Sequence, residues 1–422
     1  MTVQNLVDHL FRQSAAQMVA ALTRALGPDR LDLVEEVVQD ALVRALETWP
    51  YRGVPQNPRG WLFQVARNRA LDLLRRESSL GEKLAALPVA EIDQHSMAGG
   101  DPFADDELAM VFMCCHPALP REAQIALTLK TVCAFSVNEI AAAFLAEPPT
   151  IAQRIVRAKR TIVDRGIPLE LPHQSALRDR LEPVLEVLYL LFSEGYNAHE
   201  GEGLVREELC NEAIRMGRLL AHHPETATPA VHALLALMLL QASRLSARRD
   251  EGGSLLLLPE QNRALWNRSM INAGMRALER ASAGDSITSY HVQAAIAACH
   301  ANASSDDDTD WEHILSLYDQ LIELTPTSVI ALNRAVAVAR VHGPEAGIRE
   351  LERLRSDPAL RRYYLLPAVL GGLWYEAGRP DEAMSWYARA LELPCNAAER
   401  RFLETRLAQC ANGREPVAPV RS

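Results

Sequence analysis

The stretch FSVNEIAAAFLAEPPTIAQRIVRAKRTI, residues 135–162, decides the fold of the first part of the chain. Ser136 is placed to cap a first helix that carries Glu139 and Ile140, because a serine followed three residues later by a glutamate is typical of a helix start. Residues 145–149 supply a turn, and Thr150 begins a second helix. This spacing predicts a helix-turn-helix, although ordinary helical hairpins can show the same pattern.

The second helix of this stretch has two predicted faces. Ile151, Ile155 and Val156 are expected to point inward. The outward positions are expected to be Gln153, Arg154, Arg157, Lys159 and Arg160. A recognition helix that enters the major groove needs this division, because its polar face must contact phosphates and base edges while its apolar face holds the helix in place.

A second basic helix is predicted over residues 59–76, RGWLFQVARNRALDLLRR. One stripe is expected to face a core and consists of Trp61, Leu62, Val65, Ala66, Ala70, Leu71 and Leu74. Arginine and asparagine side chains lie off that stripe and can contact phosphates and base edges together. The preceding loop carries Tyr51, Gln56 and Asn57, which are suited to hold an unstacked base, although Asn57 before Pro58 is also a common turn residue.

The composition describes a chain that forms a packed core. It has 422 residues, 48 % of them apolar, and a formal net charge of −10. These values exclude a wholly disordered chain, a collagen-like fibre and a small disulfide-rich protein. The longest apolar candidate, Leu234–Leu240, is too short for a membrane span, and the first residues show no signal peptide. Seven scattered cysteines favour reduced thiols in the cytoplasm.

Positive charge is concentrated in two segments of this acidic chain. Residues 59–76 hold five arginines against one acid, and residues 151–165 hold five basic residues against one acid. Each segment is therefore +4. Two separated basic segments indicate two local contacts with a polyanion such as DNA, the alternative being two solvated helix faces.

The whole chain is predicted to be helical, which makes the fold class all-α. The predicted domains are a small helical domain over residues 1–77, a linker over 78–104, a second small domain over 105–168 and a larger helical region over 176–415. Near the end, Gly343 and Gly378 are 35 residues apart, which is close to the period of about 34 residues of tetratricopeptide repeats. Repeats of this kind can form a concave protein-binding surface, or the same residues can simply pack the helices.

These segments together resemble group-four, extracytoplasmic-function sigma factors of the sigma-70 family. EEVVQDALVRALETW (35–49) resembles their clamp-binding helix, WLFQVARNRALDLLRR (61–76) their −10-element helix, and 105–165 their region-four domain. A subgroup with a long C-terminal tetratricopeptide-like extension is indicated by CCHP (114–117), LLFSEGYNAHEGEGLVREELCNEAIRMGRLL (190–220) and ALNRAVAVARVHGPEAGI (331–348). The resemblance covers almost the whole chain.

The resemblance implies partners and site residues. Core RNA polymerase, through its β′ clamp coiled coil, is expected to meet Glu36, Val37, Val38, Gln39 and Asp40. The −10 surface is expected to consist of Asn57, Arg59, Arg67, Asn68, Arg69, Asp72, Arg75 and Arg76. The −35 surface is expected to consist of Thr150, Gln153, Arg154, Arg157, Lys159 and Arg160. The β flap of polymerase, promoter DNA and a regulatory protein at the C-terminal domain are the other expected partners.

Two other classes of function compete with this hypothesis. An enzyme would have to use Cys114-Cys115-His116, His199-Glu200 or His222-His223. The first is too compact for a structural zinc site, and no phosphate-binding loop or nucleophile elbow is present, so the sequence predicts no enzyme, metal or cofactor. The other alternative is a tetratricopeptide-like scaffold without promoter-directing activity.

Overall fold

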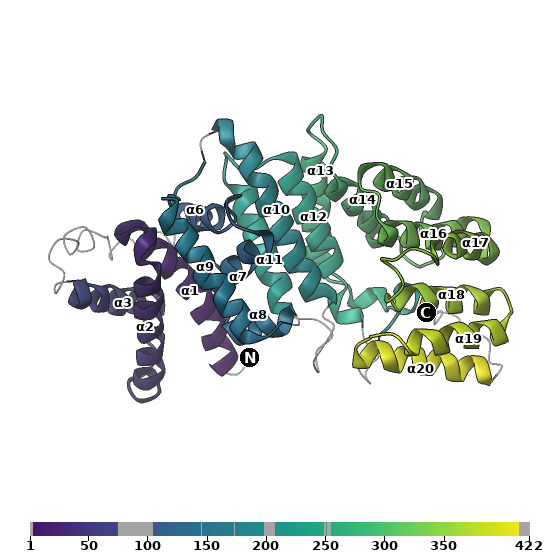
Figure 1. The fold of residues 1–422 in the computed structure, drawn as a ribbon, viewed down its shortest axis with the longest axis horizontal. Coiled ribbons are helices and arrows are strands. Elements are labelled where there is room, and N and C mark those ends of the chain that lie inside the picture. Colours follow the sequence, from purple (N-terminus) through teal and green to yellow (C-terminus); the bar gives the residue numbers. More distant parts are fainter. Residues whose placement is uncertain are drawn as a thin grey trace. The chain divides into compact units, whose positions relative to one another are not determined.

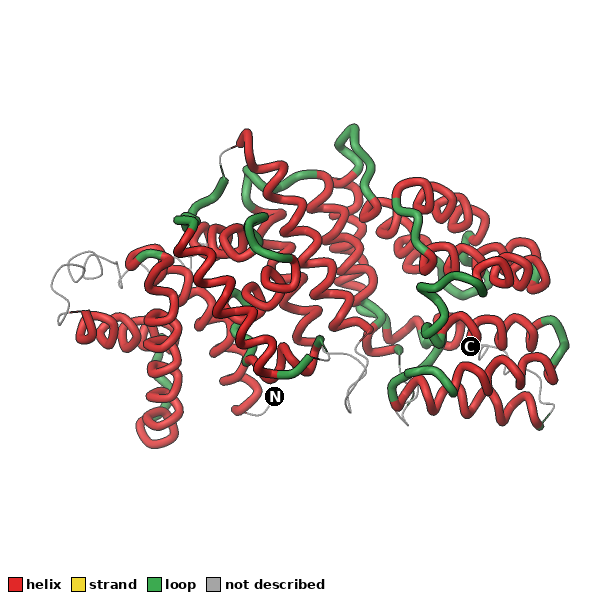
Figure 2. The backbone as a smooth tube through the Cα atoms, viewed as in Figure 1, coloured by secondary structure: helices red, strands yellow, loops and turns green. Residues whose placement is uncertain are grey.

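The structure is a computed structural model that describes residues 3–74, 104–144, 146–172, 174–197, 207–248, 250 and 255–412. Its described residues form eighteen α-helices and four short 3₁₀ turns, with no β-strand among them (Figure 2). The all-α prediction is therefore confirmed. The predicted linker lies outside the described residues except for Ala104.

The chain divides into two compact units. Unit 1 comprises Met1–Leu191 and His222–Thr226, and unit 2 comprises Phe192–Ala221 and Ala227–Ser422. Both predicted small domains thus lie inside unit 1, where the first helix of one packs against the first helix of the other. The predicted boundary near residue 170 does not coincide with the division between the units, which falls within a helix after Leu191.

The first half of unit 1 contains α1 (Val3–Leu26), the 3₁₀ turn η1 (Pro28–Arg30), α2 (Leu31–Arg52) and α3 (Pro58–Leu74) (Figure 1). Gly27 has a φ of 95° and ends α1, and Gly53, with a φ of 80°, ends α2. α2 continues through Pro50 to Arg52. Pro50 lies in the last turn, and the helix ends at Gly53, whose backbone N–H donates to the Trp49 carbonyl.

The second half of unit 1 contains α6 (Ala104–Cys114), α7 (Arg121–Thr131), α8 (Val137–Ala143) and α9 (Pro148–Asp164). Ser136 and Glu139 form the predicted capping box at the start of α8. α9 begins two residues earlier than predicted, because Pro148 and Pro149 fit the first turn of a helix, where no backbone N–H is needed. α8 and α9 both pack with α7, and with each other.

Unit 2 continues the helical pattern. α10 (Gln174–Asn197) spans the division between the units, and α11 (Glu207–His222), α12 (Pro229–Ala242), α13 (Arg268–Ala281) and α14 (Ser289–Asn302) follow. The 3₁₀ turns η2 (Leu245–Ala247), η3 (Leu258–Glu260) and η4 (Arg263–Leu265) connect α12 to α13. The remaining helices are α15 (Trp311–Leu324), α16 (Ser328–His342), α17 (Pro344–Leu354), α18 (Leu365–Glu376), α19 (Pro380–Leu391) and α20 (Ala397–Ala411).

The end of unit 2 is built from successive helix pairs, α16 with α17 and α18 with α19 (Figure 1). Gly343 and Gly378 adopt positive φ angles of 88° and 73° at the turns of these pairs. A Cβ atom at Gly371 would lie 3.0 Å from the Tyr387 ring, so a glycine lets α18 and α19 approach closely. Tyr387, Ala383 and Ala390 form part of the core between them.

One described stretch, 229–247, is apolar and long enough to cross a membrane by length and composition. It includes α12, and 72 % of its most apolar window is buried inside the structure. The helix packs against α13 and α14 on the sides where a lipid-facing helix would be exposed, as a core helix does. This stretch is longer than the run Leu234–Leu240 from which the sequence predicts no membrane span.

Candidate nucleic-acid interface

The polar face of α9 is presented much as the sequence predicted. The apolar stripe of Ile151, Ile155, Ala158 and Ile162 is buried. The exposed positions on the other side are Thr150, Gln153, Arg157 and Arg160. Arg154 is half-buried, and Arg160 lies 3.4 Å from Asp164 one turn later. The helix thus carries a cationic face anchored by an apolar one, a geometry that can contact a phosphate backbone.

Two positions of α9 are the reverse of the prediction. Val156, expected to point inward, is 63 % exposed, and Lys159, expected to point outward, has a side chain only 12 % exposed. The helical period explains both results. Lys159 follows Ile155 by four residues and precedes Ile162 by three, which places it on the buried stripe, whereas Val156 lies beside that stripe.

Lys159 is held by two carboxylates of α2. Its Nζ atom donates to Asp32 Oδ1 at 2.6 Å and to Glu35 Oε2 at 2.9 Å. Glu35 Oε1 also accepts a 3.3 Å hydrogen bond from the Thr131 hydroxyl of α7. Burial alone would lower the pKa of Lys159, but Glu35 and Asp32 outweigh it and raise the pKa. We call these four residues, Lys159, Asp32, Glu35 and Thr131, the Lys159 cluster.

The Lys159 cluster was missed by sequence reasoning, although a signal was available. Glu35 follows Leu31 by four residues and precedes Val38 by three, so this acid lies on the buried stripe of α2, as Lys159 lies on that of α9. Two opposite charges on the apolar stripes of separate helices indicate an internal ion pair, because charged groups are seldom buried without a partner.

The predicted −10 surface lies on and just before α3. Asn68, Arg69 and Asp72 are exposed, whereas Asn57, Arg59 and Arg67 are half-buried. Arg75 and Arg76 lie outside the described residues. Phe63 is buried and belongs to the core stripe, although the sequence analysis did not include it, and Trp61 is half-buried with its ring edge-on to Trp49, at 5.6 Å between centroids.

Asn57 has a structural role in addition to any role in binding. Its side-chain oxygen accepts a 2.8 Å hydrogen bond from the backbone N–H of Gly60. With Pro58 as the first residue of α3, this is the arrangement of an N-cap asparagine before an N1 proline. The alternative role of Asn57 as a turn residue is therefore present in the structure.

The predicted polymerase-binding residues of α2 divide into two groups. Glu36, Gln39 and Asp40 are exposed, but Val37 and Val38 are 0 % and 2 % exposed and pack into the core of unit 1. The two valines offer no contact surface here, which corrects the expectation for them. Asp40 lies 3.0 Å from Arg69 Nε, so an exposed acid of α2 pairs with an exposed base of α3.

The exposed face of α2 continues with two apolar side chains that the sequence analysis did not single out. Val43 is 52 % and Leu46 is 56 % exposed. They follow Gln39 by four and seven residues and share its face of the helix. An apolar patch next to charged side chains is a common mark of a protein-binding surface.

The cysteine and histidine motifs that the structure describes lie in the core or at helix ends. Cys114 and Cys115 are buried, and burial raises the pKa of both thiols, that of Cys115 to about 11. His116 Nδ1 accepts a hydrogen bond from the Ala118 backbone at 3.0 Å. His222 ends α11, and His199-Glu200 lies outside the described residues. The described part of the chain holds no group of three or more ligating side chains arranged for a metal ion.

α10 is anchored to the second half of unit 1 by two arginines. Arg180 donates to the Phe112 carbonyl of α6 at 2.7 Å. Arg121 of α7 donates to the Pro183 carbonyl at 3.3 Å and pairs with Glu186. The first turns of α10 are therefore part of the same compact unit as α6–α9.

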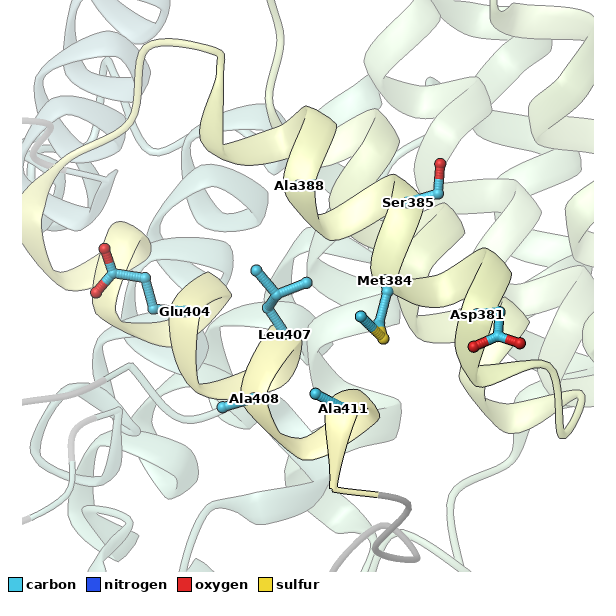
Figure 3. Close-up of a pocket in the computed structure, with 8 residues that line it drawn as sticks. All are labelled: Asp381, Met384, Ser385, Ala388, Glu404, Leu407, Ala408 and Ala411. Atoms are coloured by element: carbon cyan, nitrogen blue, oxygen red, sulfur yellow. The ribbon is translucent and has the colours of Figure 1, made fainter.

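In unit 2, a groove of about 730 Å³ lies between α19 and α20 (Figure 3). Met384 and Leu407 stand between the two helices, with Asp381 and Glu404 toward its ends. The remaining lining residues are Ser385, Ala388, Ala408 and Ala411. The lining is mostly apolar, which suits a protein segment better than a charged small molecule.

Comparison with known proteins identifies two regions of the chain. Residues 11–80 match Sigma-70 region 2, and residues 180–282 match a family of unknown function, DUF6596. An uncharacterized protein of Rhizobium meliloti (strain 1021) is 40 % identical over 413 residues, which is 96 % of either chain. No solved structure matches the chain. The chain therefore belongs to the family of this relative, with a sigma-70 region 2 formed by α1–α3 and a following region from a family of unknown function.

Proposed function

We propose that the protein is an extracytoplasmic-function type sigma factor that directs core RNA polymerase to promoters with −35 and −10 elements. The observation that carries the proposal is the Sigma-70 region 2 match over α1–α3, which implies binding to core polymerase and promoter DNA. Core polymerase is a cytoplasmic enzyme, so the cytoplasm is the proposed location. No catalytic residue or cofactor is assigned, because the polymerase performs the chemistry.

The −10 element is assigned to α3 and the loop before it. Arg59, Arg67 and Arg69 supply positive charge, and Asn68 supplies an exposed amide. A positive charge next to an amide suits contacts to phosphates and to base edges of a melted strand. Arg75 and Arg76, which lie outside the described residues, are proposed for the same surface on the sequence alone.

The −35 element is assigned to the exposed face of α9. Arg154 and Arg157 lie one turn apart near the start of the helix, and Gln153 lies beside them. Bidentate side-chain contacts to bases contribute about 1–3 kcal/mol each, so a few such residues suffice once polymerase holds the protein in place. The proposed −35 set becomes Thr150, Gln153, Arg154, Arg157 and Arg160, and Lys159 is reassigned below.

Core polymerase is proposed to contact the exposed face of α2. Glu36, Gln39 and Asp40 supply polar contacts, and Val43 and Leu46 replace the buried Val37 and Val38 as the apolar component. A mixed patch of this kind resembles the centre of a protein interface, where apolar side chains are surrounded by polar ones.

The C-terminal part is proposed to regulate the sigma factor through tetratricopeptide-like helix pairs. The helix pairs with turns at Gly343 and Gly378 support this assignment. A truncation that tests regulation should end after Leu191, because an end near residue 172 would remove the part of α10 that belongs to unit 1. A regulator predicts altered promoter use by the truncated protein, whereas a supporting role in folding or polymerase contact predicts lost activity.

The deciding experiment is run-off transcription with purified core polymerase and a library of genomic promoter fragments. We expect new, discrete start sites when the full-length protein is added. No change in start sites, together with no co-purification with core polymerase, would refute the proposal.

The second candidate function is a protein-interaction scaffold without promoter-directing activity. The apolar groove between α19 and α20 is the observation in its favour. This alternative predicts that the basic faces of α3 and α9 are incidental, so that substitutions there leave the cellular function intact.

A further inference from the structure

The two DNA-binding helices of the proposed function are joined to each other inside unit 1. Lys159 of α9 contacts Asp32 and Glu35 of α2, and α2 packs against α3. A second tie joins the same two halves, since Arg24 of α1 pairs with Asp106 of α6. The halves on either side of the predicted linker are therefore in direct contact through charged groups.

This arrangement limits how far apart the two cationic faces can lie. Arg154 is five residues from Lys159 along α9, and Asp40, which touches Arg69, is five residues from Glu35 along α2. With the 2.9 Å Lys159–Glu35 contact, helix geometry and side-chain lengths place the Cα atoms of Arg154 and Arg69 at most about 45 Å apart. Promoter elements centred at −35 and −10 are about 25 base pairs apart, roughly 85 Å of duplex.

We propose that the described conformation is a closed state that cannot engage both promoter elements, and that Lys159 holds it closed rather than binding DNA. The inference deepens the proposed function, on which it rests, by assigning a regulatory contact to the same helices. Opening separates α9 from α2 and releases Lys159 from its carboxylates, while the linker segment 78–104 keeps the halves connected.

The burial of Lys159 supports a role inside the protein. Its side chain is 12 % exposed and Glu35 is 18 % exposed, whereas Arg157 on the same helix lies on the open face. Two of the three ammonium hydrogens can be used by the 2.6 Å and 2.9 Å contacts. A DNA phosphate would have to displace both carboxylates before it could reach Nζ.

Cys114 provides a native reporter for opening. It is fully buried in unit 1, and its thiol interacts electrostatically with both Glu35 and Lys159. Separation of α9 from α2 should uncover this region. Cys210, which is buried in unit 2 and contacts the Phe192 carbonyl at 3.7 Å, serves as an internal control for general unfolding.

The test measures the alkylation rates of Cys114 and Cys210 by N-ethylmaleimide in the free, full-length protein, resolved by peptide mass spectrometry. Lys159→Gln and Glu35→Gln should each speed alkylation of Cys114 at least tenfold and leave Cys210 unchanged. Lys130→Gln and Glu122→Gln make the same charge changes on α7 outside the Lys159 cluster and should match the wild type. The charge swap Lys159→Glu with Glu35→Lys should restore slow alkylation of Cys114.

A second measurement, the affinity of Lys159→Gln for promoter DNA, distinguishes a contact that holds the closed state from a contact with DNA. Binding of the free protein to a promoter duplex should become tighter in Lys159→Gln if the residue holds the closed state, and weaker if it binds DNA. Unchanged alkylation of Cys114 in both single variants, equal acceleration at Cys210, or failure of the charge swap to restore slow alkylation would overturn the proposal. Because alkylation is measured without polymerase, these results are independent of whether transcription is directed.

Discussion

The two halves of unit 1 carry basic segments of equal net charge but place them differently. In α1–α3, Arg69 lies on the surface and pairs with the equally exposed Asp40. In α6–α9, the side chain of Lys159 is buried in the contact with the other half, and Arg180 of α10 donates to the Phe112 carbonyl of α6. A net charge of +4 in a segment therefore does not make every cation of that segment available to DNA.

The largest expected effect concerns α10, which is anchored to the second half of unit 1. A chain that ends after Pro172 loses the buried side chains of Leu181, Val184 and Leu188, each of which contributes about 1.5–3 kcal/mol. Their combined loss, about 5 kcal/mol or more, is comparable to the total stability of a small protein. We expect the chain that ends after Pro172 to lose cooperative urea unfolding, measured by circular dichroism. A chain that ends after Leu191 should unfold cooperatively. Equal behaviour of the two chains would show that α10 is not part of this half.

The next largest effect is expected from the cationic face of α9. The double variant Arg154→Ala with Arg157→Ala should reduce −35-dependent transcription about 100-fold, since two base contacts of 1–3 kcal/mol each are removed. Arg165→Ala, which removes one exposed arginine just beyond the end of α9, is the control. Core binding, measured by co-purification, should remain normal, and a joint loss of core binding would contradict the division between the halves.

A smaller difference is expected between the Lys159–Glu35 and Arg69–Asp40 ion pairs. Lys159→Gln should reduce the free energy of unfolding of unit 1 by about 2 kcal/mol, because it leaves Glu35 partly buried beside Asp32 without a cation. Arg69→Gln should cost less than about 1 kcal/mol, since that pair is half exposed. Urea titrations of the full-length variants measure both losses in free energy of unfolding. Equal losses would show that the Lys159 pair stabilises the fold no more than the exposed Arg69 pair does.

The pH dependence of the Lys159 pair has a defined direction. The pKa of Lys159 is raised in the folded protein, so its contribution to stability is complete below the unfolded value of 10.5 and is lost only as pH rises through the folded pKa. The difference in unfolding free energy between wild type and Lys159→Gln should therefore stay present at neutral pH and shrink above about pH 10.5.

Most of the fold could be predicted because helix ends have local causes. Ser136 with Glu139, Gly343 and Gly378 each mark an element boundary through their own backbone chemistry. The contact between the halves could not be predicted in the same way, because Lys159 and Asp32 are 127 residues apart and their meeting depends on how helices pack. The periodicity of α9 nevertheless places Lys159 on the buried stripe, so its position in the helix, and not its charge, indicates that it is buried.

A further test addresses the exposed face of α2, where the first half is expected to meet polymerase. Gln39→Ala with Asp40→Ala should weaken co-purification with core polymerase about tenfold, and Leu46→Ala should weaken it without changing the Asp40–Arg69 pair. Promoter binding by the free protein should change little in Leu46→Ala. Normal core binding in both variants would show that this face of α2 is not the polymerase contact.

The smallest expected effect concerns Asn57, which, like Lys159, is a predicted DNA-binding residue that also stabilises the fold. Asn57→Ala removes the oxygen that accepts from Gly60 and should cost about 1 kcal/mol of stability, whereas Asn57→Ser keeps a capping oxygen and should cost only a few tenths. If capping is its whole role, Asn57→Ser directs transcription like the wild type. If Asn57 also contacts a base, Asn57→Ser loses −10-dependent transcription while its urea midpoint stays unchanged, because serine keeps the cap but lacks the amide. Urea unfolding and −10-dependent transcription, measured on the same variants, thus distinguish a role of Asn57 in the fold from a role in promoter contact.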